Sequence, residues 1–105
     1  MDEVERLLRR LALNDEESLA GVLDPGSGAG RQKVDLLVRL GALLALGAAT
    51  SSLRATVDRA IEAGATEADI VGVLVSVAPA IGLARVVSTA PRLALAIGYD
   101  VEADE

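Results

Sequence analysis

Apolar residues recur along most of the chain at intervals of three and four positions, the spacing that places side chains on one face of an α-helix. The first such stripe predicts a helix over residues 2–13. A second helix is expected to begin at Asn14, because its side chain can cap a helix and Glu17 stands at the capping-box spacing. Pro25 ends that helix, so residues 2–24 hold two short helices.

Residues 25–30 form a glycine-rich segment, Pro-Gly-Ser-Gly-Ala-Gly. Glycines at alternate positions raise the hypothesis of a phosphate-binding loop. Such a loop requires a strand before it, and a P-loop also requires a following Gly-Lys-Ser/Thr, and the sequence offers neither. A flexible connector is therefore the favoured interpretation.

The apolar segment over residues 32–48 predicts the central helix. Nearly every face of this helix is apolar, which is typical of a helix that is buried on several sides. Past Lys33, its ionisable residues are Asp35 and Arg39, which are four positions apart and share a face. Two interpretations stay open: an ion pair that is partly exposed or lies between subunits, or a charged pair that lines a pocket.

A helix–turn–helix corner over residues 60–70 organises the C-terminal half. Gly64 can adopt the left-handed backbone that closes a helix. Thr66 is placed to cap the next helix by accepting the backbone N–H of Asp69, and Asp69 stands at the acidic position of a capping box. Because the turn is short, we expect the helices on either side to pack closely together.

Two helices flank this corner. The first is expected to open at a Thr-Ser-Ser run, with Thr50 or Ser51 as its cap, and the second to cover residues 67–78. The β-branched run over residues 70–77 also fits a buried strand, but the cap before it and the lack of a partner strand favour helix. The Ser76 hydroxyl is expected to bond the carbonyl one turn back, with a functional role as the alternative.

Two prolines are expected to set helix boundaries in the last part of the chain. Pro79 is expected to break the helical path, a further helix is predicted over residues 81–89, and Pro91 begins a short final helix. Gly98 closes that helix, and Tyr99 is expected to plug the edge of the core.

Composition indicates one domain with an aliphatic core. The chain has 105 residues, of which 51% are apolar, with one Tyr and no Phe or Trp. Leu, Val, Ile and Ala must therefore form the core. This apolar share is large for so small a chain, so we expect further copies of the chain to cover part of it.

The charged and reactive residues narrow the function. The net charge is −6, from 10 basic and 16 acidic residues, which argues against nucleic-acid binding. Residues 101–105 are expected to form a mobile acidic tail. Without Cys or His, the chain lacks thiolates, disulfides, Cys-based metal sites and the usual general base, so no metal or cofactor is expected. The lack of Cys fits a cytoplasmic location.

Membrane insertion is not expected. The N-terminal stretch is acidic and amphipathic, unlike a signal peptide. The apolar runs over residues 36–49 and 70–84 are interrupted by Arg39 and Pro79 respectively. Both fall short of the roughly 20 residues that a helical span needs.

Three segments together resemble the carboxymuconolactone decarboxylase family, which includes the alkylhydroperoxidase D-like proteins. The segments are residues 33–40, the corner over 60–70, and residues 77–85, and the resemblance covers roughly residues 33–98. It implies an all-α bundle of about six helices that assembles as homo-oligomeric trimers or hexamers, with pockets at or near subunit contacts.

The redox members of that family carry Cys-x-x-Cys and a His on the helix before the corner. By position, the resemblance places Ala49 and Ser52 at the two cysteines and Thr56 at the histidine. A hydroxyl cannot form the disulfide or the low-pKa thiolate that peroxide reduction needs. Cysteine-based peroxidase activity is thus excluded by composition.

Two hypotheses of function follow. In the first, a non-redox member binds, and in an enzyme also transforms, a small organic acid or lactone, with Asp35 as acid or base. Such a site would bring ionisable groups together in a closed pocket with a perturbed pKa. In the second, the protein is a catalytically silent oligomer that serves as a structural or partner-binding protein, and Leu, Val and Ala fill the equivalent space. The residues predicted to bind the ligand are Arg39, Ser52, Thr56 and Arg85.

Overall fold

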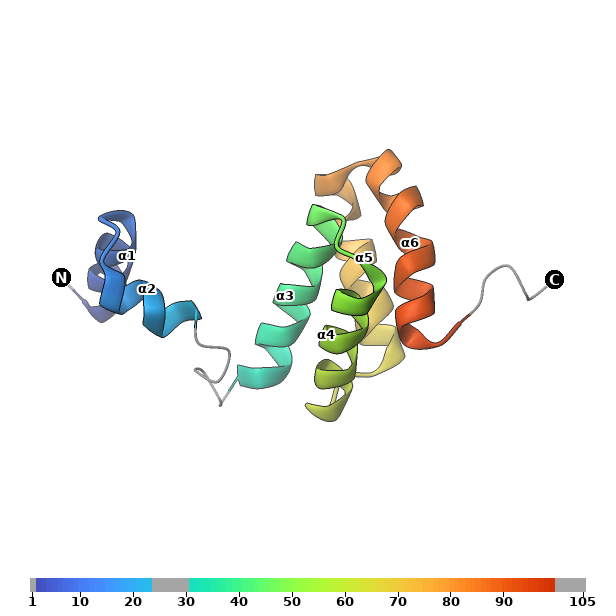
Figure 1. The fold of residues 1–105 in the computed structure, drawn as a ribbon, viewed down its shortest axis with the longest axis horizontal. Coiled ribbons are helices and arrows are strands. Elements are labelled where there is room, and N and C mark those ends of the chain that lie inside the picture. Colours follow the sequence, from blue (N-terminus) through green and yellow to red (C-terminus); the bar gives the residue numbers. More distant parts are fainter. Residues whose placement is uncertain (1, 24–30, 100–105) are drawn as a thin grey trace. The chain divides into compact units, whose positions relative to one another are not determined.

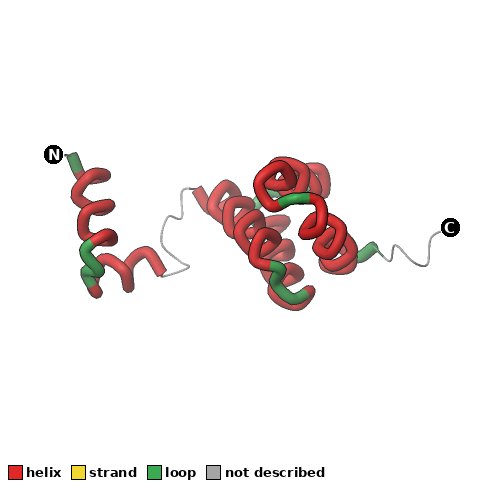
Figure 2. Tube along the Cα trace, turned by 90° about the horizontal axis from the view of Figure 1, so that it is seen from above, coloured by secondary structure: helices red, strands yellow, loops and turns green. Residues whose placement is uncertain are grey.

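The computed structural model describes residues 2–23 and 31–99 and places six helices and no strand in them (Figure 1). Within residues 2–23 and within residues 31–99, Figure 2 shows successive helices joined by short loops. This confirms the all-α class and the helical interpretation of residues 70–77. The segments predicted as a connector, 25–30, and as an acidic tail, 101–105, lie outside the described residues.

The helices belong to two compact units, residues 1–30 and residues 31–105. The N-terminal unit holds α1 (Glu3–Ala12) and α2 (Glu16–Leu23). The second unit holds α3 (Gln32–Leu46), α4 (Thr50–Glu62), α5 (Glu67–Ile81) and α6 (Leu83–Ile97). No helix in the described part of the chain is long and apolar enough to cross a bilayer.

The two N-terminal helices are fixed by their caps. The Asp2 carboxylate accepts the Glu5 backbone N–H at 2.8 Å. Asp15 caps α2, because its carboxylate accepts both the backbone N–H and the hydroxyl of Ser18, at 3.0 and 2.6 Å. The predicted cap, Asn14, is wrong by one residue: its φ is 62°, a left-handed turn conformation that Asn tolerates. Neither helix has a buried residue.

The second unit is a four-helix arrangement in which each helix packs against two others. α3 packs against α4 and α5, and α6 packs against the other sides of the same two helices. Its core is aliphatic, as the composition predicts. The buried apolar residues are Leu36, Leu40, Leu44, Leu53, Val57, Ala60, Ala65, Ile70, Leu93 and Ala96.

The corner between α4 and α5 has the predicted local structure. Gly64 has φ of 103°, and the Ala65 N–H donates to the Ala60 carbonyl at 2.9 Å, which closes α4. The Thr66 hydroxyl accepts the Asp69 N–H at 3.1 Å, and the Asp69 carboxylate accepts the Thr66 N–H at 3.0 Å. The expected close packing of the two helices is wrong, because α3 and α6 separate α4 from α5 and make the main contacts with both.

Three helix boundaries differ from the sequence prediction. α5 continues through Pro79 and α6 through Pro91, so the predicted breaks at these prolines are wrong. The break falls at Gly82 instead, where φ is 86°. Both prolines are exposed, so the hydrogen bond that each removes lies near solvent while the rest of the helix keeps its packing. Residues 81–89 and the short final helix are therefore one helix, α6.

The start of α4 is also earlier than predicted. Thr50 is the first helical residue, and Ala49 occupies the cap position without a side-chain hydrogen bond. The predicted caps, Thr50 and Ser51, are thus wrong. The cause is the tight end of α3, where Gly47 takes φ of 70° and the Ala48 N–H bonds to the Leu43 carbonyl, so that few residues are left for a loop.

Candidate functional site

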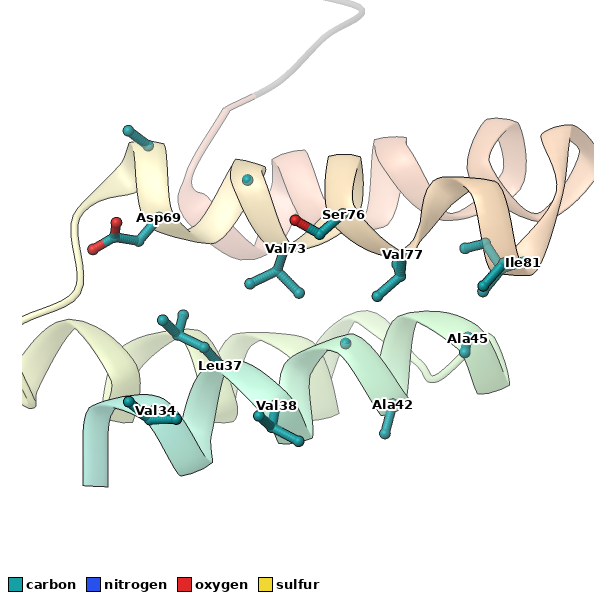
Figure 3. Close-up of a pocket in the computed structure, with 14 residues that line it drawn as sticks. Val34, Leu37, Val38, Ala42, Ala45, Asp69, Val73, Ser76, Val77 and Ile81 are labelled. Carbon is teal, nitrogen blue, oxygen red and sulfur yellow. The ribbon is translucent and has the colours of Figure 1, made fainter. Parts of the chain in front are cut away.

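The second unit has an open groove between α3 and α5, with a volume of about 740 Å³ (Figure 3). Asp69 and Ser76 are its polar residues, and all its other lining residues are apolar or glycine. The groove is therefore a surface for apolar contact. Those other residues are Val34, Leu37, Val38, Gly41, Ala42, Ala45, Ala68, Gly72, Val73, Val77, Ala80 and Ile81.

Small residues make this groove. At Gly41 the two helices are in close contact, since a Cβ there would lie 3.3 Å from Val77 Cγ1 and 3.4 Å from Val73 Cγ1. At Gly72 a Cβ would meet no atom within 4 Å, so that position opens into the hollow. The two helices are thus in tight contact at the base of the groove, while the side chains along its sides are small. The small wall residues are Ala42, Ala45, Ala68, Gly72 and Ala80.

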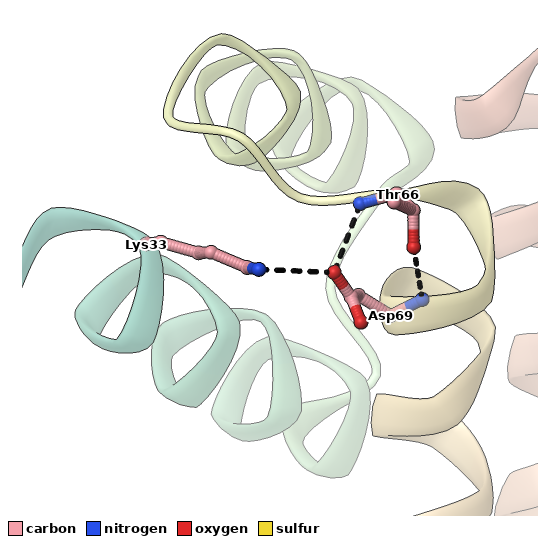
Figure 4. A network of polar contacts seen from close by, with 3 residues as sticks. All are labelled: Lys33, Thr66 and Asp69. Carbon is pink, nitrogen blue, oxygen red and sulfur yellow. Dashed lines mark hydrogen bonds and ion pairs between the residues drawn. The ribbon is translucent and has the colours of Figure 1, made fainter.

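An ion pair lies at one end of the groove. The Lys33 ammonium is 3.3 Å from the Asp69 carboxylate, the same carboxylate that completes the capping box with Thr66 (Figure 4). The Thr66 backbone N–H, and then Lys33, hold the pKa of Asp69 below its usual value of 3.8. Asp69 is therefore an ionised structural group at neutral pH, and not a proton donor for catalysis.

A second, smaller pocket of about 330 Å³ lies at the other end. It is lined by Ile81, Ala84, Arg85 and Ser88, and Ile81 also lines the groove. The Arg85 guanidinium lies against Gly47, where an added Cβ would collide with it. A cation and a hydroxyl, those of Arg85 and Ser88, thus lie beside the apolar groove.

The structure does not bring the five predicted site residues together. Asp35 and Arg39 are half-buried on α3; they form no ion pair with each other, and neither lines the groove. Ser52 is exposed near the start of α4, and Thr56 is half-buried further along that helix. Arg85 alone lines a pocket next to the groove.

Two features of the groove escape the sequence prediction. Ser76 is exposed and lines the groove, so its expected role as a core hydroxyl is wrong. The signal for this was the i, i+4, i+8 spacing of Gly72, Ser76 and Ala80, which places three small residues in one row. The Lys33–Asp69 pair carries no such signal, because its partners come from different helices.

Two arginines act on helix ends. Arg92 donates to the Gly47 carbonyl at 2.9 Å, just past the end of α3, and Arg54 donates to the Leu95 carbonyl at 3.1 Å, in the last turn of α6. The Leu95 carbonyl also accepts the Gly98 backbone N–H at 3.1 Å, so Arg54 adds a second donor there, and a cation at a helix C-terminus suits the helix dipole. These side chains therefore stabilise the fold.

Tyr99 ties the end of α6 to the first turn of α5. Its hydroxyl donates to the Glu67 carboxylate at 2.6 Å. This hydrogen bond, and then the negative charge of Glu67, raise the pKa of Tyr99. The side chain is 53% exposed, so the prediction that it plugs the core is wrong.

Comparison with known protein families, with curated proteins and with solved structures finds no match to this chain. The likeness to the carboxymuconolactone decarboxylase family stays a prediction that depends on the three sequence segments alone.

Proposed function

We propose that residues 31–99 form a self-associating helical module on a scaffold like that of the carboxymuconolactone decarboxylase family, without catalytic chemistry of its own. One observation carries the proposal: the chain has no charged residue from Ile70 on α5 to Ala84 at the start of α6, and part of this run faces outward. Val71 and Val75 on α5 and Val34 and Val38 on α3 are all exposed. A contiguous apolar surface of this kind is typical of a protein contact.

The placement of the reactive groups supports a non-catalytic role. Asp35, the predicted acid or base, does not line the groove, and Arg85 is the one predicted ligand-binding residue that lies beside it. The groove itself is lined by Val, Leu, Ile, Ala and Gly apart from Asp69 and Ser76. Acid–base catalysis requires a titratable group within reach of the substrate, and the one that lines the groove, the Asp69 carboxylate, is already engaged by the Thr66 N–H and Lys33.

Sedimentation of the full chain over a range of concentrations tests this proposal. We expect a homo-oligomer, a trimer or a hexamer, at micromolar concentration. Its melting temperature should rise with protein concentration, because association stabilises the folded state by mass action. A compact monomer whose melting temperature does not depend on concentration would contradict the proposal.

The groove also supports a second candidate, the binding of a small organic acid or lactone. Its volume of about 740 Å³ is in the usual range for ligand pockets, and Ile81 joins it to the pocket that holds Arg85. An apolar ligand body would lie in the groove while its carboxylate pairs with the guanidinium.

Thermal shift with a panel of small organic acids and lactones separates this candidate from the first. We expect an acid that binds to raise the melting temperature of the wild type and of Arg39→Ala, which lies outside the groove, but not of Arg85→Ala. Asp35→Asn is a second control, because Asp35 also lies outside the groove, and it should leave the stabilisation unchanged. No stabilisation of the wild type by any compound would exclude this candidate for the classes tested.

A further inference from the structure

We propose that a second copy of the chain covers the groove, with the α5 ridge of each copy inserted into the α3/α5 groove of the other. We call Val71, Val75 and Pro79 the α5 ridge. The inference rests on the proposed self-association and names the surface and the geometry that produce it.

The α5 ridge lies directly beside the groove. Its members are four positions apart, so they form one row along the helix. Val71 is 44% exposed and Val75 66% exposed, and Pro79 is also exposed. The neighbouring row, one position on, is Gly72, Ser76 and Ala80, which lines the groove. A row of larger, exposed apolar side chains therefore lies next to a row of small side chains.

The groove has the form that such a ridge requires. Helices pack by placing the rows of side chains on one helix into the grooves between rows on another. Glycine and alanine on both walls let a partner backbone approach, and Gly72 leaves open space above it. On the far wall, Val34, Val38 and Ala42 form a second row at the same spacing, which would flank an inserted ridge.

Symmetry and charge favour a second copy as the occupant. Ridge and groove lie on one face, so a two-fold axis through that face buries both features of both copies in a single contact. Among the described residues that line the groove, Asp69 is the one with a charge, and Lys33 already pairs with it. Over the uncharged rows of Val, Gly and Ala, a charged group of a partner would lose hydration without gaining a counter-ion, whereas another copy brings the same uncharged rows. In a hexamer this contact would be the two-fold one, alongside a separate three-fold contact.

Two matched substitutions test the surface. Val75→Glu places a carboxylate in the contact, and Val87→Glu places one on α6 at an equally exposed position, 63% against 66%. In sedimentation equilibrium of the full chain, we expect Val75→Glu to weaken the two-fold contact by roughly 100-fold or more, because two carboxylates are buried without partners. Val87→Glu should change it by less than about threefold. Both variants should keep their helical circular dichroism, because both side chains are exposed.

Cross-linking gives an independent measurement. The chain has no Cys, so Val75→Cys and Val87→Cys each introduce a single thiol. A short bismaleimide should convert Val75→Cys to covalent dimer and leave Val87→Cys largely monomeric on denaturing gels. The two-fold axis brings the ridges of both copies together, which is why the first thiol and not the second finds its counterpart.

The outcomes separate the inference from the function on which it rests. If the wild type is a monomer, both fail. If the wild type is an oligomer that Val75→Glu leaves intact, self-association stands and this surface is wrong. If Leu8→Glu, in the exposed stripe of α1, dissociates the oligomer while Val75→Glu does not, a different surface holds the copies together.

Discussion

Helices α4 and α5 follow one another across the same corner, yet their surfaces are of opposite kinds. α4 buries Leu53, Val57 and Ala60 and carries its charged residues on the outer face. α5 buries Ile70 and has no charge after Asp69. An amphipathic helix buries its apolar face against one set of neighbours, whereas a helix that is apolar on most sides needs neighbours on further sides. The comparison indicates that the unit buries the apolar surface of α4 within itself but leaves part of the apolar surface of α5 uncovered.

Polar contacts follow the same division. On the α4 and α6 side, Arg54 and Arg92 reach across to backbone carbonyls of other elements. Between α3 and α5 the ion pair of Lys33 and Asp69 lies at one end, and the rest of the contact is apolar. Arginine side chains thus stabilise the α4 and α6 side, whereas the residues that line the groove are apolar or glycine apart from Asp69 and Ser76.

The largest difference between the two helices should appear on truncation of their central side chains. Leu53→Ala, at a fully buried site on α4, should lower the free energy of unfolding by about 2–5 kcal/mol, because it leaves a cavity. Val75→Ala on α5 should change the free energy of unfolding of the monomer by less than about 0.5 kcal/mol and weaken association instead. Urea unfolding at low protein concentration, combined with sedimentation, separates the two effects. Equal losses of unfolding free energy in both variants would contradict the comparison.

At the corner between the two helices, the left-handed backbone conformation of Gly64 should determine how much a substitution there lowers the free energy of unfolding. Gly64→Ala should cost about 1–2 kcal/mol, because φ is 103° while no neighbouring atom lies within 4 Å of the new Cβ. Gly72→Ala, at an equally open but helical position on α5, should stabilise the monomer by up to about 1 kcal/mol. Urea unfolding of both variants at low concentration is the measurement. If Gly64→Ala is neutral, the left-handed turn does not limit the corner.

Removal of a buried hydroxyl on α6 should raise the free energy of unfolding, the opposite of the losses expected for Leu53→Ala and Gly64→Ala. Thr89 is fully buried and its Oγ1 has no hydrogen-bond partner. Thr89→Val should therefore raise the free energy of unfolding by about 1 kcal/mol, since it removes an unsatisfied polar group and keeps the shape. Thr89→Ser, which keeps the hydroxyl and loses a methyl group, should lower it. Destabilisation by valine would indicate that the hydroxyl bonds to an internal water.

The sequence predicts the local structure of the corner correctly, but not the features that depend on tertiary packing. The capping box of Thr66 and Asp69 and the turn at Gly64 depend on residues within a few positions of each other, and both predictions are confirmed. Pro79 shows the limit of local rules. A proline inside a helix costs roughly 3 kcal/mol, yet α5 continues through Pro79 to Ile81.

The groove was out of reach of the sequence for the same reason. Asp35 and Arg39 do share a face of α3, as their spacing predicts, but spacing alone does not indicate that α5 packs beside a different face. The rows of small residues on the two helices are visible in the sequence, yet only the packing of α3 against α5 makes them opposite walls. Residue types and helical faces could thus be predicted, and their pairing across helices could not.

The smallest expected effect concerns the charge of Asp69, at the point where the corner meets the groove. The Thr66 N–H and Lys33 hold the pKa of Asp69 in the folded state below its usual 3.8. The carboxylate therefore stabilises the fold above the unfolded-state pKa, and this contribution is lost as the pH falls through the folded-state value. The difference in unfolding free energy between the wild type and Asp69→Asn should stay constant from about pH 7 to 5 and shrink below about pH 4. Lys33→Met should reduce the size of that change without abolishing it, because the backbone hydrogen bond is the larger cause. Urea unfolding across this pH range measures both, and a difference that does not vary with pH would mean that hydrogen-bond geometry, and not charge, is what Asp69 contributes to α5.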